Sequence, residues 1–219
     1  MKKKSILCFS ILLILSTWSL FGQNELKTIR SGFKIGMTSS AFTRGYQIIT
    51  NSHISPSAGI GLDIQLVEYL SVSLDALYVQ QGATNLTLSS GDGYENIAIH
   101  GIDVPLNLNF YPLGDDNAVV PRIFAGYSFG FNLFSRSTTF TEIEGLESFS
   151  PIYRKSKNNI NSRYTIYNPG VLAGGGLLIP YGNKTFSVDF SYRVGYYNIT
   201  KLFGETSTNT ATILFGFYF

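Results

Sequence analysis

The chain has 219 residues, of which 44% are hydrophobic, 15% aromatic and only 14% charged, and its formal net charge is +2. The charged fraction is low against the roughly 25% of soluble domains, and the near-neutral net charge gives no basis for nucleic-acid binding. Cys8 is the only cysteine and lies in a predicted leader, so a processed chain can form neither a disulfide nor a thiolate metal site. We therefore expect no metal, no cofactor and no nucleic-acid partner.

The first residues have the layout of a secretory signal peptide, which we predict at 1–22. Three lysines at 2–4 precede a short apolar run at 6–15, and small or polar residues follow. An uncleaved helical anchor is the alternative, although a spanning helix needs a run of roughly 20 residues. Cleavage leaves one predicted domain at 23–219, in which 13 basic residues face 14 acidic ones after the loss of three lysines.

Eight segments of the remaining chain alternate apolar and polar residues with a period of two, which predicts β-strands with two unlike faces. The clearest is TFSVDFSYRVGYY at 185–197, with aromatic and aliphatic residues at even positions and mostly small or charged residues at odd ones. The longer segments have the roughly 9–11 residues that a tilted membrane strand needs. In chain order the segments cover 33–38, 60–66, 70–76, 102–110, 123–132, 170–179, 186–196 and 212–219, after a loose lead-in at 24–31.

The predicted connections alternate between short and long. The short or medium ones lie at 67–69, 112–120 and 180–184, and the longer ones at 41–56, 82–97, 135–167 and 198–209. Short turns at one end and long loops at the other are typical of an up-and-down barrel in an outer membrane. We therefore predict an all-β fold, a transmembrane up-and-down antiparallel β-barrel of eight strands located in the cell outer membrane. A further hairpin within 135–167 could raise the number to ten.

The charged residues decide which strand face meets which solvent. If the polar faces met lipid, a basic residue at the bilayer midplane would cost about 2–4 kcal/mol, and an acidic one somewhat less. Inside the barrel the same residues can pair, so we predict a structural ion network in the lumen rather than a catalytic site. The predicted members are Lys34, Asp63, Asp75, Asp103, Asp189 and Arg193. A soluble β-sandwich with the apolar faces inside is the alternative.

Several motifs, in this order and spacing, resemble the Bacteroidetes-type outer-membrane β-barrel family, often called PorT-like or porin-family proteins. They are GFKIGMTSS at 32–40, LSVSLDALYVQQGA at 70–83, GIDVPLNLNFYP at 101–112, FAGYSFGF at 124–131, FSYRVGYYNI at 190–199 and the terminal ILFGFYF. The resemblance covers nearly the whole mature chain and implies the same fold and location. Family members commonly carry glutamate where Asp75 stands, so the pairing of this carboxylate can differ here.

The aromatic C-terminus resembles the signal that the barrel-assembly machinery recognises, so this machinery is an expected partner during biogenesis. Phe215, Phe217 and Phe219 occupy alternate positions at the end of the chain. An ordinary aromatic last strand, contributing to an interfacial girdle, is the alternative.

Two rival functions remain beside the predicted non-enzymatic structural or interaction role in membrane integrity, adhesion or a secretion assembly. His53 and His100 would lie near the external rim, where a lipid-modifying enzyme could use them, but no nucleophile motif accompanies them. The other rival is a small-solute pore, for which eight strands leave little room. The loop at 135–167 carries charged and aromatic residues and could contact surface polysaccharide, lipid head groups or a partner protein.

Overall fold

The computed structural model of the chain describes residues 29–44, 47–48, 50–87, 93–114, 117–142, 153–199 and 206–219. The predicted signal peptide at 1–22 lies outside these residues. No helix within the described ranges is long and apolar enough to cross a membrane.

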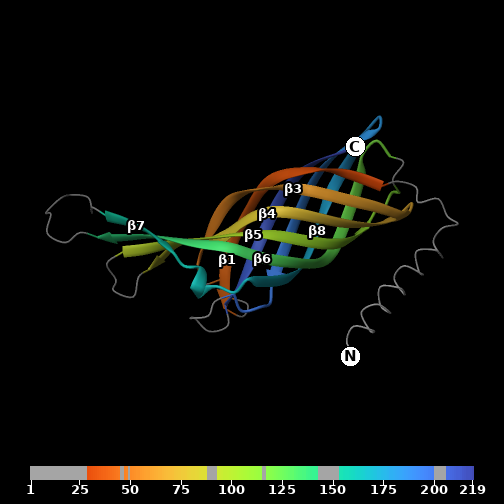
Figure 1. Ribbon diagram of the computed structural model, residues 1–219. Coiled ribbons are helices and arrows are strands. Elements are labelled where there is room, and N and C mark those ends of the chain that lie inside the picture. Colours follow the sequence, from red (N-terminus) through yellow and green to blue (C-terminus); the bar gives the residue numbers. More distant parts are fainter. Residues whose placement is uncertain are drawn as a thin grey trace, which may run out of the picture.

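Eight long antiparallel strands form a closed barrel (Figure 1). The first, β1, pairs with β3 on one side and with the last strand, β10, on the other, which closes the sheet. This confirms the predicted eight-stranded up-and-down barrel. The barrel strands are β1 (Ile29–Arg44), β3 (Asn51–Val67), β4 (Leu70–Thr87), β5 (Gly93–Phe110), β6 (Val120–Glu142), β8 (Tyr167–Tyr181), β9 (Lys184–Gly195) and β10 (Thr206–Tyr218).

Two short strands and one helical turn lie at the end of the barrel that carries the long connections. Strand β2 (Gln47–Ile48) pairs with the end of β1, and β7 (Tyr153–Asn159) pairs with the end of β6. The 3-10 turn η1 (Asn161–Arg163) follows β7. Neither short strand enters the barrel wall, so the ten-strand alternative is wrong and the extra hairpin projects beyond the wall (Figure 1).

Most strands were predicted too short. The predicted lead-in at 24–31 already contains the start of β1, and the predicted loop at 82–97 is strand up to Thr87 and again from Gly93. The ends of β4, β5 and β6 extend beyond the apolar part of the wall, where both faces are more polar. The period-two contrast is therefore weak there, and the sequence pattern marks only the lipid-facing part of each strand.

The turns at the opposite end are short, as predicted. Two residues, Glu68 and Tyr69, connect β3 to β4, and Gly182 with Asn183 connects β8 to β9. Gly182 has φ 60°, a left-handed conformation that suits a two-residue hairpin turn. Both ends of the described chain lie at this short-turn end, as expected for an even number of strands.

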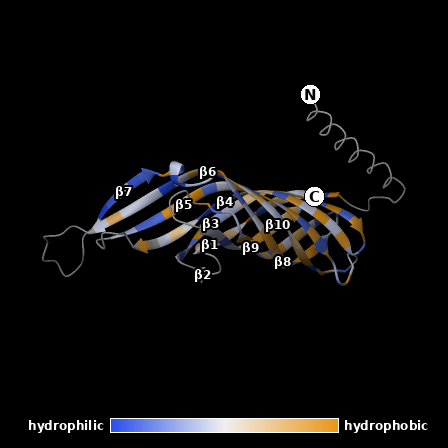
Figure 2. Cartoon of the chain, turned by 90° about the horizontal axis from the view of Figure 1, so that it is seen from below, coloured by the Kyte–Doolittle hydropathy of each residue, from blue (hydrophilic) through white to orange (hydrophobic). Residues whose placement is uncertain are grey.

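The wall is apolar outside and polar inside. On β9, Phe186, Phe190 and Tyr192 are exposed on the outer face, whereas Asp189 and Arg193 are buried inside. Hydrophobic residues gather along the barrel wall, and hydrophilic ones along β7 and the strand ends beside it (Figure 2). This arrangement rules out the soluble β-sandwich, in which the apolar faces would be buried.

Candidate functional site

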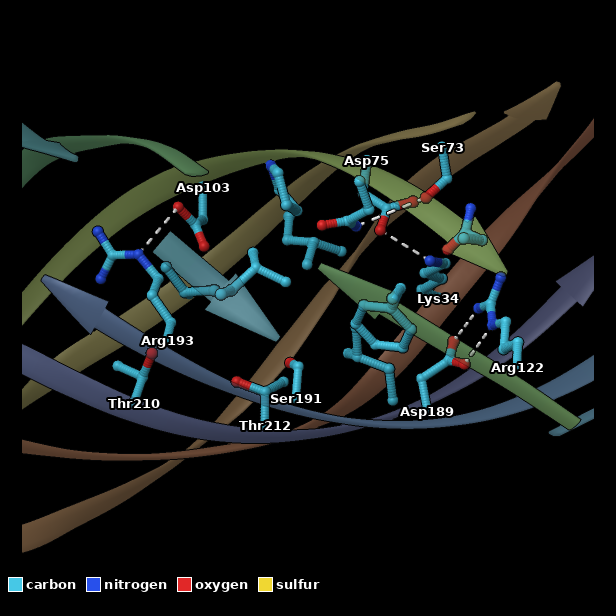
Figure 3. Close-up of a pocket in the computed structure, with 18 residues that line it drawn as sticks. Lys34, Ser73, Asp75, Asp103, Arg122, Asp189, Ser191, Arg193, Thr210 and Thr212 are labelled. Atoms are coloured by element: carbon cyan, nitrogen blue, oxygen red, sulfur yellow. Dashed lines mark hydrogen bonds and ion pairs between the residues drawn. The ribbon is translucent and has the colours of Figure 1, made fainter. Parts of the chain in front are cut away.

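Five strands, one residue from each, bring a tight charge cluster into the lumen near the short-turn end. The guanidinium of Arg122 donates two hydrogen bonds to Asp189, Nε to Oδ1 at 2.9 Å and Nη2 to Oδ2 at 2.6 Å. Its Nη1 lies 3.5 Å from Oδ2 of Asp63. Nearby, Lys34 donates to Asp75 at 2.7 Å (Figure 3). All five side chains are buried, so each charge depends on its partner rather than on water.

Neutral polar groups also contact one carboxylate oxygen of Asp63. Its Oδ2 accepts hydrogen bonds from Ser71 at 3.1 Å, from the amide of Asn109 at 3.4 Å and from the phenol of Tyr111 at 3.4 Å. The hydroxyls of Ser71 and Tyr111 are themselves 2.7 Å apart. One carboxylate is therefore held by a cation and three neutral donors, and this network joins β3, β4, β5 and β6.

A second charged layer lies further toward the long-loop end. Arg193 Nε is 3.9 Å from Oδ1 of Asp103 (Figure 3). It donates to the hydroxyl of Ser128 at 3.2 Å, and Ser128 in turn donates to Asp103. Arg193 also donates to the backbone carbonyl of Asn168, whose side-chain amide donates to Gln81 at 2.9 Å. This layer spans the lumen from β5 to β9.

Apolar side chains separate and close the charged layers. On β4, Leu77 and Val79 lie between Asp75 of the lower layer and Gln81 of the upper layer, and they pack with Leu214 of β10. A further buried cluster closes the short-turn end with Tyr111, Val120 and Leu178. The cavity that remains between the layers measures about 40 Å³, which is room for a few water molecules and for no larger solute.

The segment after β7 caps the other end of the lumen. Ile160, Tyr164 and Ile199 are buried against residues that point inward from β1, β4 and β5, namely Phe42, Ala83, Ile97 and Ile99. Backbone hydrogen bonds hold the cap, from Ile160 N to Ser135 O at 3.1 Å and from Thr165 N to Ile199 O at 2.9 Å. We call the segment 160–166 with Ile199 the cap.

The structure places all six predicted network residues inside the barrel. It pairs Lys34 with Asp75 and Arg193 with Asp103, whereas Asp63 and Asp189 meet at Arg122, which the sequence interpretation missed. The predicted strand began at position 123, whereas β6 begins at Val120, so Arg122 lay outside the prediction. Continuing its period-two pattern backward by one residue would have placed an arginine on the inner face.

The two histidines lie apart from the charged layers of the lumen. Nε2 of His53 is 2.7 Å from the amide nitrogen of Gln80, and Nδ1 of His100 is 2.5 Å from the phenol oxygen of Tyr78. His100 also stacks on Phe134, with ring centroids 4.3 Å apart. The described contacts of both imidazoles are with amide, phenol and aromatic groups.

No group of His, Cys, Asp and Glu side chains that could hold a metal ion occurs among the residues that the structure describes.

The C-terminal aromatics lie on the outer surface of the short-turn end. Phe215 and Phe219 are exposed, and Phe219 lies 5.9 Å from Phe33 between ring centroids. Phe217 contacts Phe186 at 5.2 Å. The backbone of Phe219 donates to Ser31 O at 2.9 Å. The three rings thus form part of an aromatic belt beside the seam between β10 and β1.

These features define a class of protein: a closed β-barrel whose apolar outer surface faces lipid and whose interior is filled with paired charges. Residues 21–204 match the family described as outer membrane protein beta-barrel domain, and the chain belongs to this family. It is accordingly a protein of the outer membrane.

Solved structures with a similar fold include three bacterial proteins. Ail of Yersinia pestis, solved with the heparin analogue sucrose octasulfate, is 13% identical, with 87% of this chain and 99% of that chain covered and a TM-score of 0.42. OprG of Pseudomonas aeruginosa is 14% identical, covering 87% and 92%, with a TM-score of 0.46. Neisserial surface protein A is 12% identical, covering 88% and 98%, with a TM-score of 0.42. A search of curated proteins finds no match.

Proposed function

We propose that the protein is a non-enzymatic, non-conducting outer-membrane barrel with a structural or interaction role, in membrane integrity, adhesion or a secretion assembly. The observation that carries this proposal is the filling of the lumen. Two charged layers, the apolar side chains between them and apolar closures at both ends leave a cavity of about 40 Å³. A barrel sealed in this way has its outer surface and its external segments available for contacts.

Conduction would require several coupled rearrangements. A permeating ion would have to pass the Arg122–Asp189 and Lys34–Asp75 pairs, whose side chains are 2–5% exposed. Breaking such a pair costs about 3–5 kcal/mol because a buried charge is left without its partner. The ion would then meet the apolar residues around Leu77, which offer it no ligands. An eight-stranded barrel has no spare diameter with which to avoid these groups.

Single-channel recording in planar lipid bilayers tests the proposal. The full processed chain should give no sustained open current, while a sixteen-stranded porin in the same bilayer gives one. A variant with a weakened cap, Ile160→Ala with Tyr164→Ala, should remain closed because the charged layers seal the lumen independently. Sustained currents from the unmodified protein would support the small-solute pore instead.

The enzyme alternative makes a separate prediction. If His53 or His100 acted on a lipid, His53→Ala or His100→Ala would change the lipid profile of cells that express the protein. We expect both profiles to match that of the unmodified protein, because the contacts of these side chains are to Gln80, Tyr78 and Phe134. A changed profile in either variant would contradict the non-enzymatic role.

Within the outer-membrane family, we place the chain with the PorT-like proteins of the Bacteroidetes type. The motifs from GFKIGMTSS to the terminal ILFGFYF support this finer assignment. Export would depend on the leader at 1–22, and insertion on recognition of Phe215, Phe217 and Phe219 by the barrel-assembly machinery. The external segment within 135–167 would supply the surface for a partner. Deleting Phe219 and following insertion in cells tests the assembly step.

A further inference from the structure

Three cations form a line on the outer face of the sheet just beyond the lipid-facing wall. They are Arg136 of β6 and Lys155 and Lys157 of β7, all three exposed. Lys157 lies opposite Thr138 and Lys155 opposite Phe140, two and four residues beyond Arg136 on β6. Since residues directly opposite each other in an antiparallel pair project to the same face, the three side chains share one face. We call these three residues the outer basic line.

The position of the line relative to the bilayer follows from the residues below it. The outward-facing residues of β6 between Pro121 and Leu133 are all uncharged, and most are aromatic or aliphatic. A bulge then shifts the register, so that His100 lies opposite Phe134 while Gly101 lies opposite Asn132. Beyond the bulge the even-numbered residues of β6 face outward, and Arg136 is the first charge on this face. The line therefore starts at the level where hydrocarbon gives way to headgroups.

The aromatic residues on the same face support the cations. The guanidinium of Arg136 lies 5.4 Å from the ring centroid of Phe134, and Nζ of Lys155 lies 5.6 Å from that of Phe140. Phe140 stacks on Tyr94 of β5 at 4.6 Å. Aromatic rings with adjacent cations are typical of the boundary between hydrocarbon and headgroups, where the ring remains in the apolar zone and the charge reaches water.

The charge of this face is not neutralised by the described carboxylates. Glu95, the nearest acid on β5, lies opposite Thr139 and therefore projects to the other face, where it accepts from Ser137 and lies 3.7 Å from Arg163. None of the three cations of the outer basic line forms an ion pair with a residue that the structure describes. Glu142, opposite Tyr153, follows Phe140 by two residues and so shares this face at its membrane-distal end. Three basic residues therefore stand against one acidic residue, and the net charge of the face beside the membrane surface is positive.

We propose that the outer basic line binds the phosphate groups of an anionic lipid in the leaflet that surrounds the barrel. The line rises from the edge of the lipid-facing surface, so a lipid whose acyl chains lie against β5 and β6 presents its headgroup to Arg136 first. Guanidinium and ammonium groups both donate hydrogen bonds to phosphate, and arginine does so in a bidentate way. The proposal is independent of whether the lumen conducts, because the line lies outside the barrel.

A soluble polyanion or an acidic protein fits the geometry less well. Either partner would approach the membrane-distal tip of the hairpin, whereas Arg136 lies next to the lipid boundary and adjoins the His100–Phe134 stack. The continuity of the cations with the apolar wall favours a ligand that is itself embedded in the bilayer.

Native mass spectrometry of the full processed chain in detergent micelles tests the proposal with a diphosphorylated glycolipid as the probe. The variant Arg136→Gln/Lys155→Gln/Lys157→Gln should bind this lipid at least about tenfold more weakly, since each basic residue near an anionic surface is worth about fivefold in affinity. The matched control is Arg154→Gln, which removes an exposed cation of the same strand opposite Thr141, on the other face. Its affinity should change by less than about twofold.

Three outcomes would overturn the proposal. Equal affinity in the triple variant and in Arg154→Gln would show that the line does not hold the lipid. Equal binding of the same glycolipid without its phosphates would show that the acyl chains alone determine affinity. Competition by millimolar inorganic phosphate or by a soluble acidic peptide, at constant ionic strength, would identify a soluble ligand instead. Heat-modifiable gel mobility of each variant establishes that the barrel has folded before binding is compared.

Discussion

Arg122→Ala removes the cation that connects two carboxylates of the lower charged layer. Asp189 loses two hydrogen bonds of 2.9 and 2.6 Å, and Asp63 loses a cation at 3.5 Å. Both carboxylates are at most 5% exposed, so water cannot replace the guanidinium fully. Removing one partner of a buried ion pair costs about 3–5 kcal/mol. We expect the loss to fall near the upper end, because Asp63 retains only neutral donors.

Urea-induced unfolding of the refolded protein in lipid vesicles, followed by tyrosine fluorescence, measures this loss. A double-mutant cycle with Asp189→Ala separates the pair from the cavity that each substitution creates. Arg122→Ala/Asp189→Ala should be less destabilising than the sum of the single changes, with a coupling of about 1–3 kcal/mol. The exposed Lys155→Ala is the matched control and should stay within about 0.5 kcal/mol of the parent. A coupling below about 0.5 kcal/mol would refute the reasoning that Arg122 organises this layer.

Three further changes test other parts of the structure. Asp75→Ala leaves Lys34 buried without its 2.7 Å partner, so the unfolding temperature in micelles should fall. The fall should be smaller in Lys34→Ala/Asp75→Ala, and an equal fall in both variants would mean that the pair is not coupled. Tyr164→Ala should make residues 160–166 sensitive to protease while the barrel keeps its heat-modifiable gel mobility, because the cap packs on the wall without belonging to it; loss of folded mobility would assign the cap to the barrel core. Deletion of Phe219 should lower the amount of protein inserted into the outer membrane of cells several-fold. It should change the free energy of unfolding after refolding by about 1 kcal/mol or less, since the ring is largely exposed. A large loss of stability with normal insertion would assign Phe219 a packing role.

The membrane part of the fold could be predicted from sequence because lipid imposes a strict contrast between the two faces of each strand. Position 75 is acidic between apolar neighbours, and this alone assigns Asp75 to the lumen. The contrast disappears above the bilayer, where both faces of β6 and β7 meet water or polar neighbours. The hairpin at β7 therefore had no period-two signal, and the sequence indicated a long loop in which a hairpin was only one alternative.

The partners within the lumen could not be predicted from sequence for a different reason. Lys34 and Asp75 lie on β1 and β4, which are separated by β3 in the wall, and their contact depends on barrel radius and stagger. Neither quantity is encoded in the residues that surround the pair. The cap was equally inaccessible, because Ile160, Tyr164 and Ile199 come from segments without regular patterning and meet only when the barrel brings their anchors together.

The charged lumen also defines the register of the wall. An apolar interior would stabilise the barrel as well as paired charges do, since replacing a buried ion pair by well-packed hydrophobic residues is often neutral. Such a chain, however, would be apolar on both faces, and a strand that slipped by one residue would remain compatible with lipid. With the observed sequence, a one-residue slip of β9 would point Asp189 and Arg193 toward the lipid hydrocarbon and Phe190 into the lumen. The slip would cost free energy at every one of these side chains. The ion pairs therefore contribute more to the choice of one register than to net stability. Charges on separate strands meet across the barrel axis only when each strand is in that register.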